Sequence, residues 1–535
     1  MSSNKNTIPN NINNSNSFVN VLVLWASRTL IFCSLLQCIF FFDSNNFIAV
    51  LTINISFYIL IITTLKQSFF KNFPLSIFLI IGFFLTQLYL PLIFTLLEGN
   101  PVVFNLKLSN EVFLHSFLIL ITLIISHYVY RQFSYLHKNK LRNILLRFDF
   151  FTPPSDTQIW IIGLIGVFAT FYVYIYAKSA LKLTGGSFDK FIESLINFAY
   201  APYFIGIGII YGRNEKINNN YLIKISVYTI IIFLVSVARN SRGAFMFGFT
   251  SLAYSYILCI GLGIKKANFF NKKNIILLIM SFWLIIGPIS DLSTAMVAVR
   301  NQRHEVSSFN LLEMTIKAYE NKTLLQQFKN NKSGDDSGWD EYYLNNVLLS
   351  RFCNIKFNDA SLIEASKLNF KIDKGFQDFS INRTIAILPT PILTLLGIDL
   401  NKNLINYSFG DYLFAKANYL GNDYSVIGVN RTGHISGTGM ISFGWWYLLL
   451  LFIFIIPCYY IIDSCYINLK STISNGFEPR ISLCILLAIN SVFIFLPSES
   501  VMTLPMFLTR GWIQMYILYY FIFKFSYFIS FFIKK

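Results

Sequence analysis

The sequence predicts an all-α membrane protein, a polytopic bundle of about twelve transmembrane helices with one large extracytoplasmic loop between the ninth and tenth spans. Hydrophobic residues make up 55% of the 535 residues, charged residues only 13%, and the mean hydropathy is +0.55. Soluble domains carry about 25% charged residues, so roughly half of the usual charge is missing. The apolar residues form long runs, and Lys and Arg gather in short segments between those runs.

Each span is predicted from the length of an apolar run, because a helix needs about 20 mainly apolar residues to cross the hydrocarbon core. The runs lie at about 18–42, 46–65, 73–97, 111–130, 157–177, 191–211, 221–238, 243–263, 274–296, 441–463, 480–497 and 503–525. The Asn- and Ser-rich segment 1–17 is typical of a disordered tail. The last apolar stretch, 525–533, is too short to cross again and is expected to lie along the inner surface.

The distribution of positive charge predicts the orientation. The loops after the second, fourth, sixth, eighth and tenth spans are basic, and so is the C-terminus. Short cytoplasmic loops carry an excess of Lys and Arg, so these loops and both termini are expected to be cytoplasmic. The predicted organisation is a cytoplasmic tail at 1–17, spans one to nine at 18–296, a large extracytoplasmic loop at 297–440, and spans ten to twelve with the cytoplasmic C-terminus at 441–535.

Two segments of the large loop have a pattern of their own. Residues 342–370 carry apolar residues at helical spacing and are expected to form an amphipathic helix on the membrane surface. Residues 385–398 are apolar but too short to span. They are expected to dip into the edge of the bilayer or to pack inside the loop.

The sequence gives no support for nucleic-acid, metal or cofactor chemistry. The formal net charge is +17, but the charges fall in short loops rather than in one basic surface. No P-loop, GxSxG, HExxH or dinucleotide-binding pattern occurs, and the seven cysteines and five histidines lack metal-ligand spacing. We therefore expect no nucleic-acid partner, no metal, no cofactor and no disulfide framework.

A tight turn at 238–243 joins two apolar runs and holds Arg239 and Arg242. Arginine is costly at membrane depth unless it has a partner. Two guanidinium groups in one turn can hold a phosphate or pyrophosphate by bidentate hydrogen bonds, and Gly243 would let the backbone approach that ligand closely. The alternative is that both side chains extend to lipid phosphates.

Five further arginines are expected on the outer side, and one of them, Arg383, lies within the large loop. Arg300 and Arg303 are three residues apart, so on a helix they share a face just beyond the ninth span. The alternative for this pair is a solvated helix end at the lipid head groups. Arg431 precedes the tenth span, and Arg510 lies at the edge of the last span, where it is expected to face the interior.

A glycine-rich segment at 430–439 carries His434 close to the membrane. Histidine titrates near neutrality and suits proton transfer, so His434 is the first candidate for a catalytic base. Asp411 is the second candidate, either as a base or as a partner for an arginine. The alternatives are a flexible loop with a bystander histidine and an aspartate that caps a turn.

These features resemble a known family. The Arg239-x-x-Arg242-Gly243 turn, a large arginine-bearing loop in the C-terminal half, and the approach to the tenth span through Gly437, Gly439 and Gly444 are similar to bacterial oligosaccharide repeat-unit polymerases. These are the Wzy-type polymerases of O-antigen, capsule and exopolysaccharide, which are related in architecture to O-antigen ligases.

The resemblance implies a reaction at the outer face of the bacterial cytoplasmic (inner) membrane. A glycan on undecaprenyl pyrophosphate is transferred to the distal sugar of a new lipid-linked repeat unit, and undecaprenyl pyrophosphate is released. The arginines named above would bind the pyrophosphate, and His434 or Asp411 would deprotonate the acceptor hydroxyl. The implied partners are the lipid-linked oligosaccharide, membrane lipids, a chain-length regulator and a flippase.

Two alternatives remain open from the sequence. An O-antigen ligase shares the architecture and the arginines but transfers the glycan to a different acceptor. A flippase or other transporter is the non-enzyme alternative, although transporters often show paired repeats and short loops. The large loop and the absence of visible repeats in this chain favour an enzyme.

Overall fold

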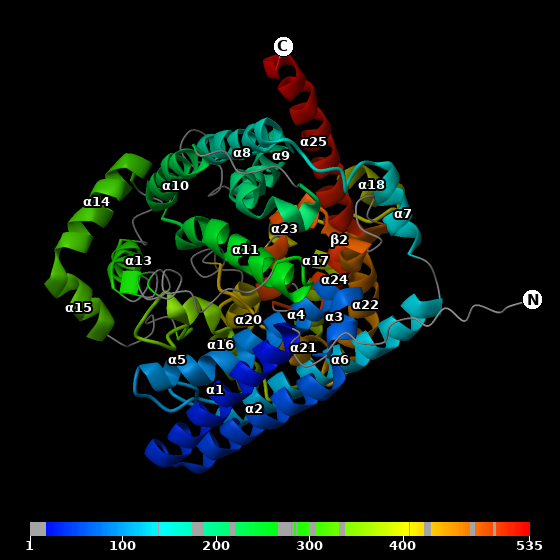
Figure 1. Cartoon of the computed structure of the whole chain (residues 1–535). Coiled ribbons are helices and arrows are strands. Elements are labelled where there is room, and N and C mark those ends of the chain that lie inside the picture. The colour runs from blue at the N-terminus through cyan, green and yellow to red at the C-terminus, as the bar shows by residue number, and fades with distance from the viewer. Residues whose placement is uncertain are drawn as a thin grey trace, which may run out of the picture.

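The computed structural model of this chain is almost entirely helical (Figure 1). It describes residues 18–136, 139–173, 187–213, 220–238, 240–265, 276, 280, 283–284, 287–299, 306–330, 338–405, 407–421, 430–470, 477–495 and 499–534. Within these ranges one antiparallel hairpin, made by β1 (Tyr466–Lys470) and β2 (Phe477–Ile481), is the only sheet. The predicted all-α class is confirmed.

The helices, with 3₁₀- and π-helical segments labelled η, follow the chain in two groups. Up to residue 261 they are α1 (Phe18–Phe40), α2 (Ser44–Thr63), α3 (Gln67–Asn72), α4 (Pro74–Phe84), η2 (Leu85–Tyr89), α5 (Leu90–Leu97), α6 (Ser109–Leu136), α7 (Lys140–Arg147), α8 (Asp156–Phe171), α9 (Ser187–Ser194), η5 (Ile196–Tyr211), α10 (Tyr221–Ala238) and α11 (Arg242–Gly261). After it they are α13 (Pro288–Ala298), α14 (Ser308–Glu320), α15 (Lys322–Asn330), η7 (Leu349–Phe352), α16 (Ile355–Lys367), α17 (Lys374–Ile385), α18 (Thr390–Leu395), α19 (Lys402–Ile405), α20 (Phe409–Ala417), α21 (Ile435–Phe443), α22 (Trp446–Asp463), α23 (Leu483–Leu487), η8 (Ser491–Phe495), α24 (Thr503–Met506), η9 (Phe507–Gly511) and α25 (Trp512–Lys534).

Among the described residues, nine helical stretches are long and apolar enough to cross a membrane. They are Val19–Phe40, Ser44–Thr63, Pro74–Leu97, Ser109–Ser134, Phe188–Tyr211, Tyr221–Ala238, Gly243–Gly261, Trp446–Asp463 and Thr503–Ile533. Each coincides with one of the twelve predicted spans. The chain is therefore a multi-pass membrane protein.

The other three predicted spans have no such helix. The fifth corresponds to α8, which has 16 residues, and the rest of that run lies outside the described residues beyond 173. The ninth, predicted at 274–296, falls largely outside the described residues as well. The eleventh is divided into α23 and η8, each of five residues. The count of twelve therefore stays a prediction.

The tenth span begins later than predicted because the chain turns at Gly444. Helix α21 ends at Phe443, and Gly444 has φ 56° and ψ −149°, a conformation essentially restricted to glycine. The membrane helix α22 starts only at Trp446. The segment before the turn therefore forms a separate helix, α21, which packs against α16 and α17.

Two local expectations were wrong in part. The helix predicted at 342–370 starts only with the 3₁₀ turn η7, and α16 begins at Ile355, because side-chain contacts replace regular structure before it. The stretch 525–533 does not turn aside, since α25 continues as one helix to Lys534 and ends at the C-terminus (Figure 1). The apolar stretch 385–398 forms only the short α18, with Leu395 86% exposed.

Hydrogen bonds sort the described loops between spans into two sets. In the first set, Glu98 after α5 accepts from the backbone N–H of Asn345 at 2.8 Å, and Glu499 after η8 accepts from that of Phe409 at 3.2 Å. These contacts bring two short loops onto the large loop. We call this set the outer loops, after their predicted orientation.

The second set contains the basic loops. Tyr466 donates its hydroxyl to the carbonyl of Lys71 at 2.7 Å, and Arg142 donates to the carbonyl of Asp463 at 3.1 Å. Loops that alternate along the chain thus gather at two separate ends, as the predicted alternation of spans requires. The Lys and Arg bias alone predicts which end faces the cytoplasm.

Candidate active site among the outer loops

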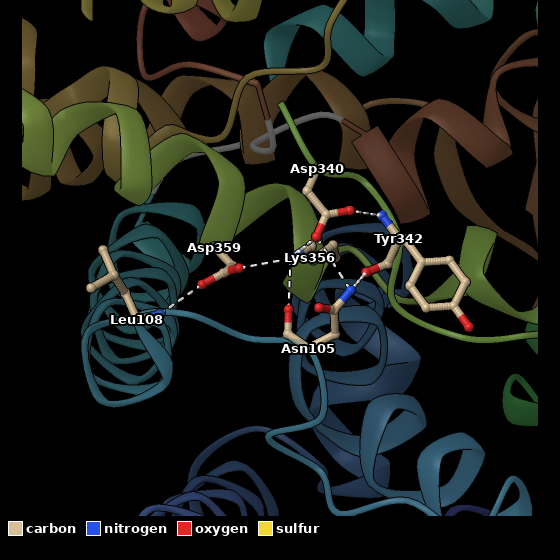
Figure 2. Close-up of polar contacts among 6 residues, drawn as sticks. All are labelled: Asn105, Leu108, Asp340, Tyr342, Lys356 and Asp359. Carbon is tan, nitrogen blue, oxygen red and sulfur yellow. Dashed lines mark hydrogen bonds and ion pairs between the residues drawn. The ribbon is translucent and has the colours of Figure 1, made fainter. Parts of the chain in front are cut away.

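Lys356 in α16 anchors the large loop to the loop after α5, as Figure 2 shows. Its Nζ lies 3.2 Å from Asp340 and 2.9 Å from Asp359, and it donates to the carbonyl of Asn105 at 2.6 Å. Asp359 also accepts from the backbone N–H of Leu108 at 2.9 Å. The Lys356 side chain is 2% exposed. A buried ion needs such partners, and here they fix the large loop on the ends of the membrane helices.

Glu98 holds the non-helical segment that precedes α16. Its two carboxylate oxygens accept from the backbone N–H groups of Asn345 and Asn346, both at 2.8 Å. The buried hydroxyl of Tyr343 donates to the carbonyl of Val102 at 2.7 Å. Backbone groups that no helix satisfies are therefore satisfied by these side chains. The outer loops form a fixed platform here.

His434 is the N-cap of α21 and is 1% exposed. Its Nε2 lies 2.9 Å from the amide nitrogen of Gln87, and its Nδ1 lies 2.8 Å from the hydroxyl of Ser436. Ser436 in turn donates to the side-chain oxygen of Asn358. Both ring nitrogens thus have partners, from η2 and α21, and Asn358 of α16 holds Ser436 in place.

A neutral ring accounts for the contact with Gln87, since Nε2 accepts from its amide nitrogen, and Nδ1 is paired with the hydroxyl of Ser436. Burial lowers the pKa of His434 to about 3, and His115 adds to this shift. In this arrangement the ring has no open nitrogen for an acceptor hydroxyl. The assignment of His434 as base therefore stays a prediction that this geometry does not support.

Asp411 is completely buried and fixes the start of the glycine-rich segment. Its carboxylate accepts from the backbone N–H groups of Asn430 and Arg431, both at 2.9 Å, and from the guanidinium of Arg431 at 3.3 Å. Arg431 also lies over the ring of Phe414, at 4.2 Å. Asp411 and Arg431 thus hold each other, and their predicted catalytic and pyrophosphate-binding roles stay untested.

Glu499 and Arg383 lie beside this pair. Glu499 accepts at Oε1 from the N–H of Phe409, and its backbone carbonyl accepts from Thr438 at 3.2 Å. Arg383, in the last turn of α17, lies over the ring of Phe409 at 4.6 Å. Its Nη1 is buried and has no hydrogen-bond partner among the described residues. The two side chains interact electrostatically without an ion pair in the described residues.

The pKa values of both groups are shifted by burial. Burial raises the pKa of Glu499, and the charge of Arg383 and the N–H of Phe409 oppose that shift. Burial lowers the pKa of Arg383, although Glu499 and Asp411 oppose it. For both Glu499 and Arg383, neighbouring charges therefore only partly offset the cost of burying the charged side chain.

Arg510 is exposed and belongs to a second group of cations. It donates to the side chain of Gln514 and to the carbonyl of Ile387, both at 3.1 Å. Lys402 of α19 donates to the next carbonyl, that of Leu388. The prediction that Arg510 faces the bundle interior was therefore wrong. Its side chain lies at the surface of the outer loops.

The remaining predicted arginines are only partly described. Arg239, Arg300 and Arg303 lie outside the described residues, and of Arg242 only the backbone, at the start of α11, is described. Asn240 in the same turn donates to a carbonyl of α13 at 2.7 Å. This contact brings Asn240 close to the end of α13.

The described residues contain no group of three or more His, Cys, Asp or Glu residues placed to hold a metal ion.

Comparison of the chain with protein-family models, with curated protein sequences and with solved structures finds no match in any of the three.

Sequence reasoning did not find Glu499. It stands in a short break, at 498–500, between two apolar runs, and acidic residues number only 26 in the chain. An acidic residue so close to membrane helices is a signal in itself, because a charged side chain there is energetically costly and is usually kept for a function. Arg383 was noticed only as one outer cation among others.

Proposed function

We propose that the protein is a glycosyltransferase that polymerises undecaprenyl-pyrophosphate-linked oligosaccharide repeat units at the outer face of the bacterial cytoplasmic membrane. One observation carries this proposal beyond the resemblance: a carboxylate, Glu499, and a guanidinium, Arg383, lie together on the outer loops without neutralising each other in an ion pair. Glycosyl transfer needs a base for the acceptor and positive charge for the leaving group.

Glu499 suits the role of base. A base is most effective when its pKa lies near the working pH, and burial moves the pKa of Glu499 upward from its ordinary value. Its Oε1 is oriented by the N–H of Phe409. Its Oε2 makes no hydrogen bond to the described residues and is available to an acceptor hydroxyl.

Arg383 suits the stabilisation of negative charge. Its Nη1 is a buried donor without a protein partner among the described residues. An unpaired guanidinium of this kind favours an anionic oxygen, and such fixed donors stabilise charge that develops in the transition state. The arginines at 239, 242, 300 and 303 stay the predicted ligands of the donor pyrophosphate.

The proposed step balances as a single displacement. The acceptor hydroxyl gives its proton to Glu499, and the acceptor oxygen forms a bond with the anomeric carbon of the donor. The bond between that carbon and the phosphate oxygen breaks, and undecaprenyl pyrophosphate leaves with the electron pair. His434 and Asp411 act in this scheme as positioning residues, because their contacts hold the segment that also contacts Glu499.

The proposal is tested in cells that lack the gene and carry plasmid-borne variants. With Glu499→Gln, single repeat units on undecaprenyl pyrophosphate should accumulate in the outer leaflet of the membrane, and polymer should disappear. Glu313→Gln is the matched control, since Glu313 is an exposed carboxylate of the same large loop. Lipid-linked glycans are extracted and sized, and protein levels are compared by immunoblot.

Other outcomes separate the alternatives. If long polymer persists on the undecaprenyl lipid when the gene is deleted, the protein is a ligase. If repeat units stay on the cytoplasmic side, it is a flippase. Polymer of normal length with Glu499→Gln would remove Glu499 from the mechanism.

A further inference from the structure

A cavity of about 230 Å³ lies where the start of η5 faces η9, α25 and α23. Its walls are mainly apolar and include Phe198, Leu487 and Leu518. Along one wall, the lining residues extend from Gly511 to Tyr519. Eight residues of helix span about 12 Å, so the cavity follows the membrane helices for part of their length.

Three cations stand at one end of this cavity. Arg510 directly precedes Gly511 in the chain and donates a hydrogen bond to Gln514. Gly511 and Gln514 both line the cavity. Lys190 lies one helical turn before Ser194, another lining residue. Lys402 completes the group, which comes from η9, α9 and α19. We call Lys190, Lys402 and Arg510 the cationic rim.

No carboxylate among the described residues forms an ion pair with the cationic rim. The described ion pairs all involve other side chains. The pKa of Lys402 is lowered, first by burial and then by the charges of Arg510 and Lys190. The three cations therefore repel one another, and a bound anion would relieve that repulsion.

Capping of α17 accounts for part of this arrangement only. Lys402 and Arg510 donate to the carbonyls of Leu388 and Ile387, just beyond the end of α17, where positive charge is favourable. A cap does not need a third cation or an adjoining apolar cavity. In addition, Arg510 lies in the π-helical turn η9 within an otherwise α-helical stretch, and such turns occur frequently at functional sites.

We propose that the cationic rim and the cavity bind a single-chain lipid diphosphate, with the diphosphate on Lys190, Lys402 and Arg510 and the first part of the lipid chain in the cavity. The residues of this site differ from the arginines that the sequence analysis assigned to the pyrophosphate, which are Arg239, Arg242, Arg300, Arg303, Arg431 and also Arg510, so only Arg510 is shared. The inference rests on the proposed function only for the identity of the lipid, undecaprenyl pyrophosphate, as donor carrier or released product.

Charge and volume favour this occupant over a bulk phospholipid. Three cations match a diphosphate better than the single negative charge of phosphatidylglycerol. The volume of about 230 Å³ is smaller than the 300–1,000 Å³ of ordinary ligand pockets, so it suits part of one chain rather than two acyl chains.

Binding is measured with the full-length protein in phosphatidylcholine nanodiscs, titrated with undecaprenyl pyrophosphate. The double variant Lys402→Gln/Arg510→Gln should bind at least tenfold more weakly while it remains folded in the absence of ligand. Lys524→Gln, further along α25 in an ion pair with Asp149, is the matched control and should bind as the wild type does. Ala488→Phe, which fills the cavity, should weaken binding of the lipid but not of inorganic pyrophosphate.

Three results would overturn the inference. They are wild-type affinity in the double variant, equal affinity for undecaprenol, which lacks phosphate, and equal competition by phosphatidylglycerol. A double variant that only melts at a lower temperature and binds normally would assign these cations to capping. The test needs no transfer reaction: Glu499→Gln should bind the lipid normally, so a failure of the proposed function leaves this result readable.

Discussion

Two cations of the outer loops, the buried Lys356 and the partly buried Arg383, have opposite surroundings. Lys356 has two carboxylates and a carbonyl oxygen within 3.2 Å. Arg383 lies over the ring of Phe409 and has a buried Nη1 with no hydrogen-bond partner among the described residues. The first arrangement is complete without a ligand, whereas the second is completed by one. Pairing, rather than burial alone, thus separates a structural cation from a candidate for binding.

The largest expected effect is on the stability of the paired site. Lys356→Met leaves the buried Asp359 and the partly buried Asp340 without their cation, which should lower the free energy of unfolding by about 3–5 kcal/mol. Thermal unfolding of the purified protein in detergent measures the loss. Adding Asp359→Leu to this variant should recover part of it. An unchanged melting temperature in Lys356→Met would break the comparison.

Arg383→Met should have the opposite profile. Removing the guanidinium of Arg383 breaks no ion pair among the described residues, so the melting temperature should change little. Transfer of repeat units should fall by about 10²–10³-fold, the usual effect of losing one donor to developing charge. Arg383→Lys should restore little activity, because it lacks the planar fork of donors. A large loss of stability in Arg383→Met would place it with Lys356.

A pH effect of intermediate size is expected at His434. Its pKa in the folded protein, about 3, lies below that of an unfolded histidine, about 6.5, so the unfolded state binds the additional proton. Stability is therefore lost as the pH falls below about 6.5, by about 2 kcal/mol at pH 5. Melting temperatures of the wild type and His434→Gln, recorded from pH 7 to pH 5, should converge. Parallel curves would show that this ring does not carry the effect.

The smallest effect is expected at an exposed pair. Lys317 and Glu313 in α14 lie 2.7 Å apart, but both side chains are more than half exposed. Exposed ion pairs contribute little because water and salt screen them. Lys317→Ala should therefore leave the melting temperature and polymer length unchanged. A clear loss of either would show that an exposed charge in this loop can still matter for stability or function.

Much of the fold could be predicted from the sequence because a bilayer permits few solutions. Backbone groups inside the membrane must be satisfied within the helix, so apolar runs of span length predict helices directly. The departures lie where packing overrides length. Gly444 separates α21 from α22, and the run at 480–497 is divided into α23 and η8. Neither break follows from hydropathy.

The candidate site was less accessible to prediction. His434 and Asp411 attracted attention as isolated polar residues, but their partners come from distant segments, such as Gln87 in η2. Glu499 and Arg383 meet only because α17, α20 and the loop after η8 pack together. Residue type alone does not show whether a charge is paired. That information appears only when the loops are placed against one another.

The contact between Gly437 in α21 and Ser361 in α16 determines whether a ligand can pass between these two helices. A Cβ atom at position 437 would overlap the backbone of Ser361, so the two helices touch directly. The glycine-rich segment therefore seals this junction instead of serving as a hinge. In the proposed reaction, a growing sugar chain would have no passage between α16 and α21 and would leave along another side of the loops.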